Sequence, residues 1–576
     1  MPKNIVIIGG VALGPKVACR IRRLDPDAEI TMVDKDRYIS YGGCGIPYYV
    51  GGDVSELNAL YSTSAHVVRD SLFFRNAKRV NVRIETEAMA IDRTAKTVTL
   101  RSCTEGKMST IPYDTLVLAM GALPVVPPIP GADLPGVSVV ATLHHAEGIK
   151  DRIASGKVEK AVVIGGGAIG LEMAEALTDL WGVETTLVEM QDQLLPGPLG
   201  RDMALILKNH MEEKGVRVLL SERVTRIRGD ATTGVSGIET ATTQIPCDLV
   251  VMAVGVRPNV VLAREAGIAL GPHGGVAVDQ FMRTNDPDIY AGGDCVEIPN
   301  IISGQQVHMP LGSLANRQGR VIGTNIAGGH ATFPGTAGAF CIKVFDLAAA
   351  RSGLTFTQAG AAGFDPVQVV VAQADRAHFY PTQEMMCMKL IADRSTRRVL
   401  GVEAVGPNGD AVKARVDAVA AVLPFAATLD VISNLEVAYA PPYASAMDIV
   451  NSAANALENT IEGRHQAVDV EDFLKAFKDH HAKVLDVRST IQADPFVKKY
   501  AGQWRNIPQE DLVCRLEEID AEGITAEEPL FLICGSGPRS YEAQLLLRSK
   551  GICATRNIQG GIKMLQSCDP KFAPSS

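Results

Sequence analysis

One cysteine, Cys44, lies among glycines in the stretch SYGGCGIPYY, which spans residues 40–49. An enzyme that works with a pair of thiols would carry a second cysteine a few residues later, but Tyr48 and Tyr49 stand there. A thiolate is the nucleophile in sulfur exchange, and the N–H groups of a glycine-rich loop at a helix start stabilise it. A lone thiolate can form a mixed disulfide with an incoming disulfide or persulfide. We therefore predict that Cys44 is a redox nucleophile whose sulfur partner arrives with the substrate; the alternative is a buried, inert cysteine.

A second cysteine, Cys534, begins the loop CGSGPRS after an apolar run. Four residues separate it from Arg539, and Ser540 follows. Inward-pointing N–H groups of such a loop would hold an anion or a persulfide and stabilise the thiolate. We predict that Cys534 is a second reactive thiol, with Arg539 beside it.

Two segments share the order of an apolar run, a glycine-rich turn, a helical stretch and a second apolar run, which is typical of dinucleotide-binding units. In the first segment Val11 stands where the second glycine of GxGxxG would let the backbone approach a pyrophosphate. Asp34 ends the second apolar run and can accept hydrogen bonds from ribose hydroxyls. The alternative is a glycine turn in an unrelated α/β protein. The predicted site consists of Gly9, Gly10, Gly14, Asp34 and Lys35.

The second segment, from Lys160, has the complete pattern in Gly165, Gly167 and Gly170. Glu189 lies nineteen residues after Gly170 and favours NAD, because a carboxylate there would repel the 2′-phosphate of NADP. Glu172, on the helical stretch, belongs to the same predicted site. Two dinucleotide sites in one chain are most economically a flavin and a nicotinamide. We expect NADH as the electron donor, with NADPH left open.

The 576 residues predict three to five domains at roughly 100–200 residues per domain. The net charge of −9 argues against non-specific binding to nucleic acid or to an anionic membrane. No apolar run of about 20 residues occurs, so no membrane span is expected. The eleven cysteines form no CxxC, and we predict no metal site. A dispersed, odd set of cysteines in a large chain is typical of free thiols in the cytoplasm.

The order of these motifs resembles the two-dinucleotide flavoprotein disulfide reductases, in which the N-terminal unit takes FAD and the inserted unit takes the nicotinamide. The stretch TNDPDIYAGGDC, residues 284–295, is similar to the family's second FAD motif, which implies that Asp294 bonds the ribityl chain. AMG, residues 119–121, stands where the family has ATG, and Gly121 keeps the turn. The stretch SYGGCGIPYYVGG resembles the single-cysteine branch, which contains coenzyme A disulfide reductases, coenzyme A persulfide or polysulfide reductases, and NADH oxidases or peroxidases.

This resemblance, over residues 1–455, implies that coenzyme A lies with its thiol at Cys44. It also implies a homodimer whose active site is shared across the subunits. Tyr439 and Tyr380 would come from the partner copy and donate to the leaving sulfur; the alternative is that they pack an interface. The implied contacts for coenzyme A are Arg22, Arg23, Ser40 and Asn316.

The C-terminal region, about residues 465–570, resembles a rhodanese-like sulfurtransferase through CGSGPRS, VLDVRS (484–489) and NIQGG (557–561). The family's GHIPGA is absent, and WRNIPQEDL (504–512) stands nearby. This resemblance implies that Cys534 carries sulfane sulfur; the alternative is an inactive module that serves in binding or dimerisation.

The sequence thus predicts an α/β chain with two Rossmann-like domains, an α/β dimerisation domain and a rhodanese-like α/β domain. The predicted boundaries are 1–118 with 246–330 (FAD), 119–245 (NAD), 331–455 (dimerisation), 456–468 (linker) and 469–576 (rhodanese-like). The predicted function is reduction of coenzyme A persulfide, polysulfide or coenzyme A disulfide. The alternatives are an NADH oxidase or peroxidase that cycles Cys44 through sulfenic acid, and a sulfur-carrying or redox-sensing flavoprotein with little turnover.

Overall fold

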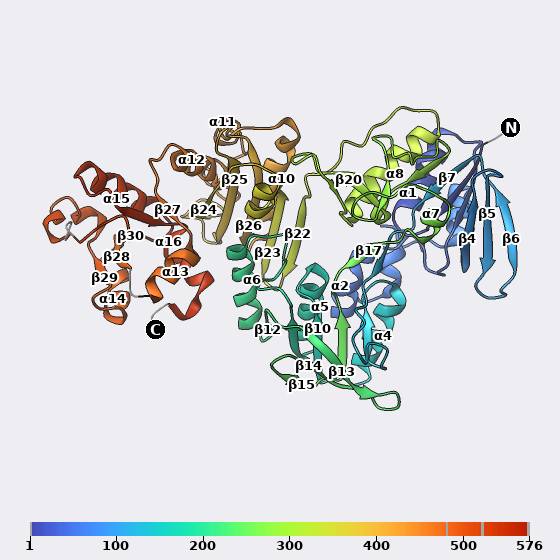
Figure 1. The fold of residues 1–576 in the computed structure, drawn as a ribbon, viewed down its shortest axis with the longest axis horizontal. Helices are drawn as coiled ribbons and strands as arrows, with labels where there is room; N and C mark the ends of the chain where they lie inside the picture. The colour runs from blue at the N-terminus through green and yellow to red at the C-terminus, as the bar shows by residue number, and fades with distance from the viewer. Residues whose placement is uncertain (1–2, 480–481, 520–522, 573–576) are drawn as a thin grey trace. The chain divides into compact units, whose positions relative to one another are not determined.

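The computed structural model describes residues 3–479, 482–519 and 523–572 of the chain. These residues form two compact units. The first consists of residues up to 190 together with 215–336, and the second of residues 191–214 together with the chain from 337 onwards. Both units mix helices and sheets, as the sequence predicts (Figure 1).

The first unit contains a parallel sheet in the order β19-β7-β1-β2-β3. Its apolar residues are buried, as expected for a parallel strand with both faces covered. Helices α1 (Leu13–Leu24) and α8 (Gly312–Ile326) pack closely together. Gly323 permits this approach, since a Cβ at that position would lie only 2.7 Å from Arg20 Cβ. The strands are β1 (Asn4–Ile8), β2 (Glu29–Val33), β3 (Asn81–Arg83), β7 (Thr115–Leu118) and β19 (Ile289–Ala291).

A second parallel sheet, in the order β12-β11-β10-β16-β9, lies in the same unit. Helix α5 (Ala168–Thr178) connects β10 to β11 as α1 connects β1 to β2, so both predicted strand–turn–helix–strand segments are present. Helix α4 (Leu143–Ala154) follows β9. The strands are β9 (Val137–Val139), β10 (Lys160–Ile164), β11 (Glu184–Val188), β12 (Arg217–Leu219) and β16 (Leu249–Met252).

Smaller elements complete the first unit. The helices are α2 (Ile46–Gly51), α3 (Ser71–Lys78) and α7 (Val261–Glu265). The antiparallel sheets comprise β4 (Thr86–Asp92), β5 (Thr97–Ser102) and β6 (Met108–Pro112); β13 (Val224–Asp230), β14 (Gly234–Thr240) and β15 (Gln244–Ile245); and β8 (Ala122–Pro124) with β17 (Val256–Pro258). A mixed sheet joins β18 (Val276–Ala277), β20 (Val296–Pro299) and β21 (Gln306–Val307).

The second unit begins with an antiparallel sheet in the order β22-β23-β26-β25-β24. The strands are β22 (Phe340–Val344), β23 (Leu347–Gly353), β24 (Pro366–Ala374), β25 (Met385–Asp393) and β26 (Val399–Gly406). Its helices are α9 (Phe356–Ala361), α10 (Gly409–Val422), α11 (Leu429–Ser433) and α12 (Ile449–Ile461).

Helix α6 (Arg201–Glu213) belongs to this second unit by its contacts. Lys389 on β25 forms a buried ion pair with Asp202, and the Gly200 N–H donates to Glu403 Oε2 on β26 at 2.8 Å. The sequence prediction grouped these residues with the NAD-binding segment 119–245. Their partners lie 187 and 203 residues further along, where no local pattern reveals them.

The rest of the second unit is a parallel sheet in the order β27-β31-β30-β28-β29. The strands are β27 (Ala467–Val468), β28 (Lys483–Asp486), β29 (Trp504–Asn506), β30 (Leu530–Ile533) and β31 (Thr555–Ile558). The helices are α13 (Val470–Lys478), α14 (Thr490–Lys499), α15 (Pro538–Ser549) and α16 (Gly561–Cys568). Most of the stretch 456–468, which we predicted as a linker, consists of the end of α12 and of β27.

In the part of the chain that the structure describes, no helix combines the length and apolar character that crossing a bilayer requires. The same residues contain no group of three or more His, Cys, Asp or Glu side chains arranged to hold a metal ion.

Candidate active site

The first glycine turn follows β1 and is held by the acid at the end of β2. A Cβ on Gly14 would lie 1.9 Å from Gly9 O, so this close approach of helix and turn requires glycine. Asp34 Oδ2 accepts the Gly10 N–H at 2.6 Å, and Oδ1 accepts the Asp36 N–H at 2.8 Å. Burial raises the pKa of Asp34. Lys35 is exposed beside it.

Two further predicted FAD residues lie at the ends of neighbouring strands. Gly121 follows β7, and Asp294 follows β19. Because β1, β2, β7 and β19 are parallel, their carboxyl ends meet at one edge of the sheet, where nucleotides bind in this architecture. Burial raises the pKa of Asp294, and His308, whose Nε2 lies 2.8 Å from the Asp294 carbonyl oxygen, opposes that effect. The structure thus brings the predicted FAD residues to one edge, and their donors and small turn fit a dinucleotide.

The second glycine turn repeats this design at β10 and β11. A Cβ on Gly170 would lie 1.9 Å from Gly165 O, whereas a Cβ on Gly167 would meet nothing within 4 Å. That open space, at the start of α5, would let a pyrophosphate approach the backbone. Glu189 is buried, and its Oε2 accepts the Gly166 N–H at 2.6 Å. The residues present therefore fit a nicotinamide dinucleotide.

Both acids thus hold their own glycine turn, a role that sequence reasoning missed. The sequence predicts only that Asp34 accepts from a ribose and that Glu189 repels the 2′-phosphate of NADP. The recurrence of an acid nineteen or twenty residues after the last glycine of each turn was the available signal. A carboxylate oxygen that accepts one N–H keeps a lone pair for a ribose hydroxyl, so the two roles are compatible.

Cys44 lies in a single turn of 3₁₀ helix (Gly43–Gly45) that runs directly into α2. Its side chain is exposed, in contrast to the buried, inert alternative. The Ser40 N–H donates to the Gly10 carbonyl at 2.7 Å, which ties this segment to the first glycine turn. Cys44 is therefore an accessible thiol on a segment anchored to the predicted flavin site.

The tyrosines that replace a second thiol attach α2 to its neighbours. Tyr48 OH lies 3.4 Å from Glu172 Oε1 on α5. Lys150 on α4 donates to the Tyr49 carbonyl at 2.9 Å, and its Nζ lies 3.8 Å from the centre of the Tyr49 ring. The position of the missing thiol thus serves packing between helices.

Glu172 is the predicted nicotinamide residue with the most altered acidity. Burial raises its pKa to about 7, Tyr48 opposes this by hydrogen bonding, and Glu175 adds to it. Glu172 therefore holds a proton up to neutral pH in the protein without nicotinamide.

We expect this proton to make stability depend on pH. The folded-state pKa lies above the ordinary value of 4.5, so the stabilisation is complete below pH 4.5 and is lost as the pH rises through 7. The unfolding free energy of the wild type should fall relative to Glu172→Gln by on the order of 3 kcal/mol across that window. Urea unfolding at pH 5 and pH 8 without nicotinamide measures the change. The exposed Glu184→Gln is the matched control and should track the wild type; equal behaviour of both variants contradicts the prediction.

The residues predicted to contact coenzyme A differ in whether their polar groups already form hydrogen bonds within the chain. The Arg22 guanidinium donates to five main-chain carbonyls, those of Asp25, Pro26, Ala28, Lys78 and Arg79. Arg23 and Asn316 are exposed, and Asn316 Nδ2 donates to Gly312 O at 2.9 Å. Ser40 is buried, and its N–H donates to the Gly10 carbonyl of the first glycine turn. Arg22 is thus occupied within the chain, and Arg23 is the better placed of the two for a phosphate.

The two predicted tyrosines belong to the second unit. The segments that carry them meet, because the Ala377 N–H donates to Pro441 O at 3.2 Å and the Tyr380 N–H to Ala377 O at 2.8 Å. Tyr439 is 51% exposed and Phe379 is 66% exposed. Exposed aromatic side chains of this size gather where another protein surface packs.

Cys534 follows β30, and its side chain is almost wholly buried at 1% exposure. The Gly537 N–H donates to Sγ at 3.1 Å and the Ser540 hydroxyl at 3.3 Å. The sequence names Ser540 without a role; its single hydroxyl proton faces two acceptors, Cys534 Sγ at 3.3 Å and Gly537 O at 2.9 Å. Arg539 Nη2 would lie 3.5 Å from a Cβ on Gly535, so the guanidinium borders the loop.

The neighbouring strand supports this loop. The Val487 N–H donates to Ile533 O at 3.0 Å, and Arg488 forms a buried ion pair of 2.6 Å with Asp486. The start of α16 closes the other side, where the Ile562 N–H donates to Cys534 O at 2.9 Å. The segments that carried the sulfurtransferase resemblance therefore meet around Cys534.

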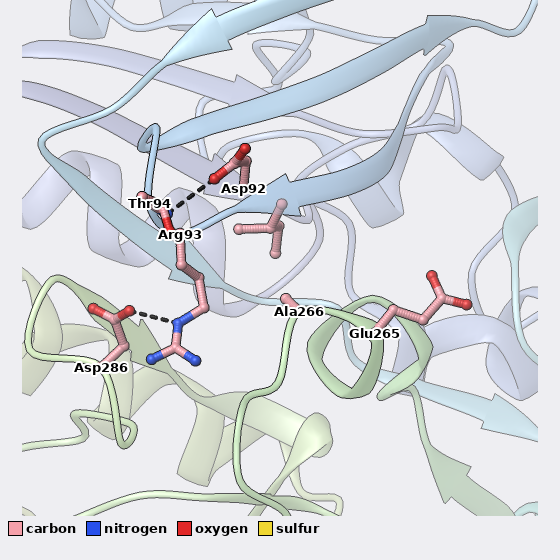
Figure 2. Close-up of a pocket in the computed structure, with 7 residues that line it drawn as sticks. Asp92, Arg93, Thr94, Glu265, Ala266 and Asp286 are labelled. Atoms are coloured by element: carbon pink, nitrogen blue, oxygen red, sulfur yellow. Dashed lines mark hydrogen bonds and ion pairs between the residues drawn. The ribbon is translucent and has the colours of Figure 1, made fainter.

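A polar hollow in the first unit is a poor site for a nucleotide (Figure 2). Its one arginine, Arg93, donates to Asp286 Oδ2 at 2.7 Å and to Gly267 O at 3.1 Å. Asp92 and Glu265 also line it. With its guanidinium engaged and carboxylates around it, this hollow disfavours an anionic ligand.

Known proteins resemble this chain over most of its length. A Pyrococcus abyssi protein named NAD(P)H sulfur oxidoreductase (CoA-dependent) is 33% identical over 446 residues, which covers 77% of this chain and 96% of that relative. A Methanocaldococcus jannaschii protein named NADH oxidase is 34% identical over 454 residues, which covers 78% of this chain and 97% of that relative. The solved structure of a NAD-dependent persulfide reductase from A. fulgidus is 40% identical with a TM-score of 0.91, covering 97% of this chain and 99% of that one.

Family models agree with these likenesses. The model described as pyridine nucleotide-disulphide oxidoreductase, dimerisation domain, matches residues 340–450. The model of the main domain matches residues 3–319, more than half of the chain. On the two glycine turns, the anchored Cys44 segment and these matches, the chain belongs to the pyridine nucleotide-disulphide oxidoreductase family.

Proposed function

We propose that this chain is an FAD-dependent reductase that takes electrons from NADH and cleaves the sulfur–sulfur bond of coenzyme A persulfide, polysulfide or coenzyme A disulfide. The observation that carries the proposal is the exposed Cys44, anchored through Ser40 to the first glycine turn, with tyrosines where a second thiol would stand. The names of the relatives from Pyrococcus abyssi and A. fulgidus support the substrate class.

Cys44 performs the sulfur chemistry. Its thiolate attacks coenzyme A persulfide at the sulfur bound to coenzyme A, which forms the mixed disulfide Cys44–S–S–CoA and releases hydrosulfide. With coenzyme A disulfide the same attack releases one coenzyme A thiolate. FAD, when bound, would supply the two electrons from NADH that break this mixed disulfide, which returns Cys44 to a thiolate and releases coenzyme A as its thiolate. Glu189 selects NADH by its charge.

Coenzyme A would be held by residues of both copies in a homodimer. In this proposal Arg23 contacts a phosphate, and Ser40 and Asn316 contact the same molecule. Tyr439 and Tyr380 of the second copy donate to the leaving sulfur, which the exposure of Tyr439 and the match to a dimerisation domain support. The dispersed free cysteines support a cytoplasmic setting.

The C-terminal domain, within 469–576, acts in this proposal as a rhodanese-like sulfurtransferase. Cys534 attacks a polysulfide, becomes a persulfide and leaves the polysulfide one sulfur shorter. Coenzyme A thiolate then takes the outer sulfur and leaves Cys534 as a thiolate. The two donors to Sγ, the bordering Arg539 and the extent of the likeness to the A. fulgidus enzyme support this role.

An NADH oxidase is the second candidate, because the Methanocaldococcus jannaschii relative bears that name. The purified enzyme should consume NADH much faster with coenzyme A persulfide than with oxygen alone. Faster consumption with oxygen would overturn the proposal in favour of the oxidase. Turnover measured per hour rather than per second with every acceptor would instead favour a carrier or a sensor.

A further inference from the structure

A buried histidine lies in the short segment between α12 and β27. His465 is 7% exposed, and its ring packs against that of Tyr541 on α15, with centroids 5.1 Å apart. Both ring nitrogens have partners. Nε2 lies 2.9 Å from Asn557 Nδ2, and Nδ1 lies 3.1 Å from Thr460 Oγ1 on α12. His465 is not one of the groups that attack or release sulfur in the proposed reaction.

The partners determine which nitrogen carries the proton. Asn557 Nδ2 can only donate, so Nε2 accepts and the proton lies on Nδ1. The Nδ1–H then donates to Thr460 Oγ1, whose hydroxyl donates to Ala456 O at 2.9 Å. Burial lowers the pKa of His465 to about 4, so the ring stays neutral and the arrangement persists at neutral pH.

The Asn557 amide extends this series of hydrogen bonds to the sulfur. Its Nδ2 also lies 3.4 Å from Gly537 O, and the Gly537 N–H donates to Cys534 Sγ. Asn557 is buried, and its Oδ1 has no hydrogen-bond partner among the residues that the structure describes. The orientation of the amide therefore depends on the two acceptors that its Nδ2 faces, His465 and Gly537.

We propose that His465 and Asn557 are positioning residues for Cys534, which hold Gly537 so that its N–H points at the sulfur. This inference rests on the proposed sulfur transfer at Cys534. It makes the segment between α12 and β27 part of the Cys534 site, because the hydrogen bonds run from Thr460 at the end of α12 to the reactive loop.

Alkylation of the full-length protein by iodoacetamide, followed peptide by peptide with mass spectrometry, tests this directly. In His465→Leu, which has similar bulk and no hydrogen bonds, the midpoint of the Cys534 alkylation profile should move to higher pH. At pH 7 the rate, relative to its plateau at high pH, should fall about fivefold, as expected for one lost neutral hydrogen bond. His465→Gln, whose amide can accept from Asn557 and donate to Thr460, should retain most of the wild-type profile. Alkylation of Cys44 should not change in either variant.

A purely structural role would give a different result. A loosened loop raises the plateau rate without moving the midpoint, and that outcome overturns the proposal. Tyr500→Phe is the matched control, because it removes a 2.8 Å hydrogen bond to Phe572 O in the same sheet-and-helix assembly; an equal shift of the midpoint in this variant also overturns it. If His465→Leu fails to fold, Thr460→Val tests the other end of the series with the same readout. Since alkylation needs no turnover, the result is independent of whether Cys534 transfers sulfur.

Discussion

Cys44→Ala is expected to abolish NADH-dependent reduction of coenzyme A persulfide and coenzyme A disulfide, by at least about 10³-fold in kcat. Alanine offers no nucleophile, and the exposed side chain has no second thiol in its motif to replace it. The variant should keep its flavin, because the groups that form the glycine turn are main-chain atoms and Asp34. Steady-state NADH oxidation with each substrate, together with the flavin absorbance of the purified protein, measures both effects.

Cys103→Ala is the matched control for this experiment. Cys103 is also exposed, but it lies in the turn between β5 and β6, away from the glycine-rich segment. This variant should keep wild-type rates. If Cys44→Ala kept more than a tenth of the wild-type rate while folded and loaded with flavin, the sulfur chemistry would not occur at Cys44 and the proposed function would be wrong.

Cys534→Ser should reduce polysulfide turnover at low coenzyme A concentration by about tenfold or more and leave the reduction of coenzyme A disulfide unchanged. The substitution exchanges sulfur for oxygen, which can still accept from Gly537 and Ser540, so the loop should keep its structure. Only the polysulfide route uses this thiol, because coenzyme A disulfide reacts at Cys44 directly. Parallel assays of NADH consumption with the two substrates give the comparison.

Cys553→Ser serves as the control, since Cys553 is exposed and lies between α15 and β31 in the same sheet-and-helix assembly. It should leave both rates unchanged. Equal loss of both activities in a folded Cys534→Ser protein would contradict separate roles for the two thiols. Unchanged polysulfide turnover would indicate an inactive module that serves in binding or dimerisation.

Much of the candidate site could be predicted because its signals are local. The two glycine turns depend on close approaches between residues a few positions apart, such as Gly14 to Gly9 and Gly170 to Gly165, so their spacing is visible in the chain. The absence of a second thiol near Cys44 is likewise visible in ten consecutive residues, 40–49. The order of apolar run, glycine-rich turn, helical stretch and second apolar run is also local, and it predicted the mixed α/β architecture.

Other features depend on partners far apart in the sequence. Arg22 resembled a free cation for a phosphate, but its guanidinium is occupied by carbonyls up to 57 residues away. Helix α6 lies within the segment predicted to bind NAD, yet its buried ion pair is formed with β25. The stretch 456–468 is polar and resembled a linker, but His465 within it is buried against residues up to 92 positions away.

The sequence by itself determined the two glycine turns, the solitary cysteine of the first glycine-rich segment and the second cysteine loop, because each is encoded by residue types at short, fixed spacing. Only the tertiary structure decided that Asp34 and Glu189 hold their own turns, that Arg22 is occupied, and that the His465 ring meets the Asn557 amide. These roles depend on which donor and acceptor meet when distant segments pack and exclude water. A local pattern specifies the groups that need partners, and the packed fold specifies which partners they find.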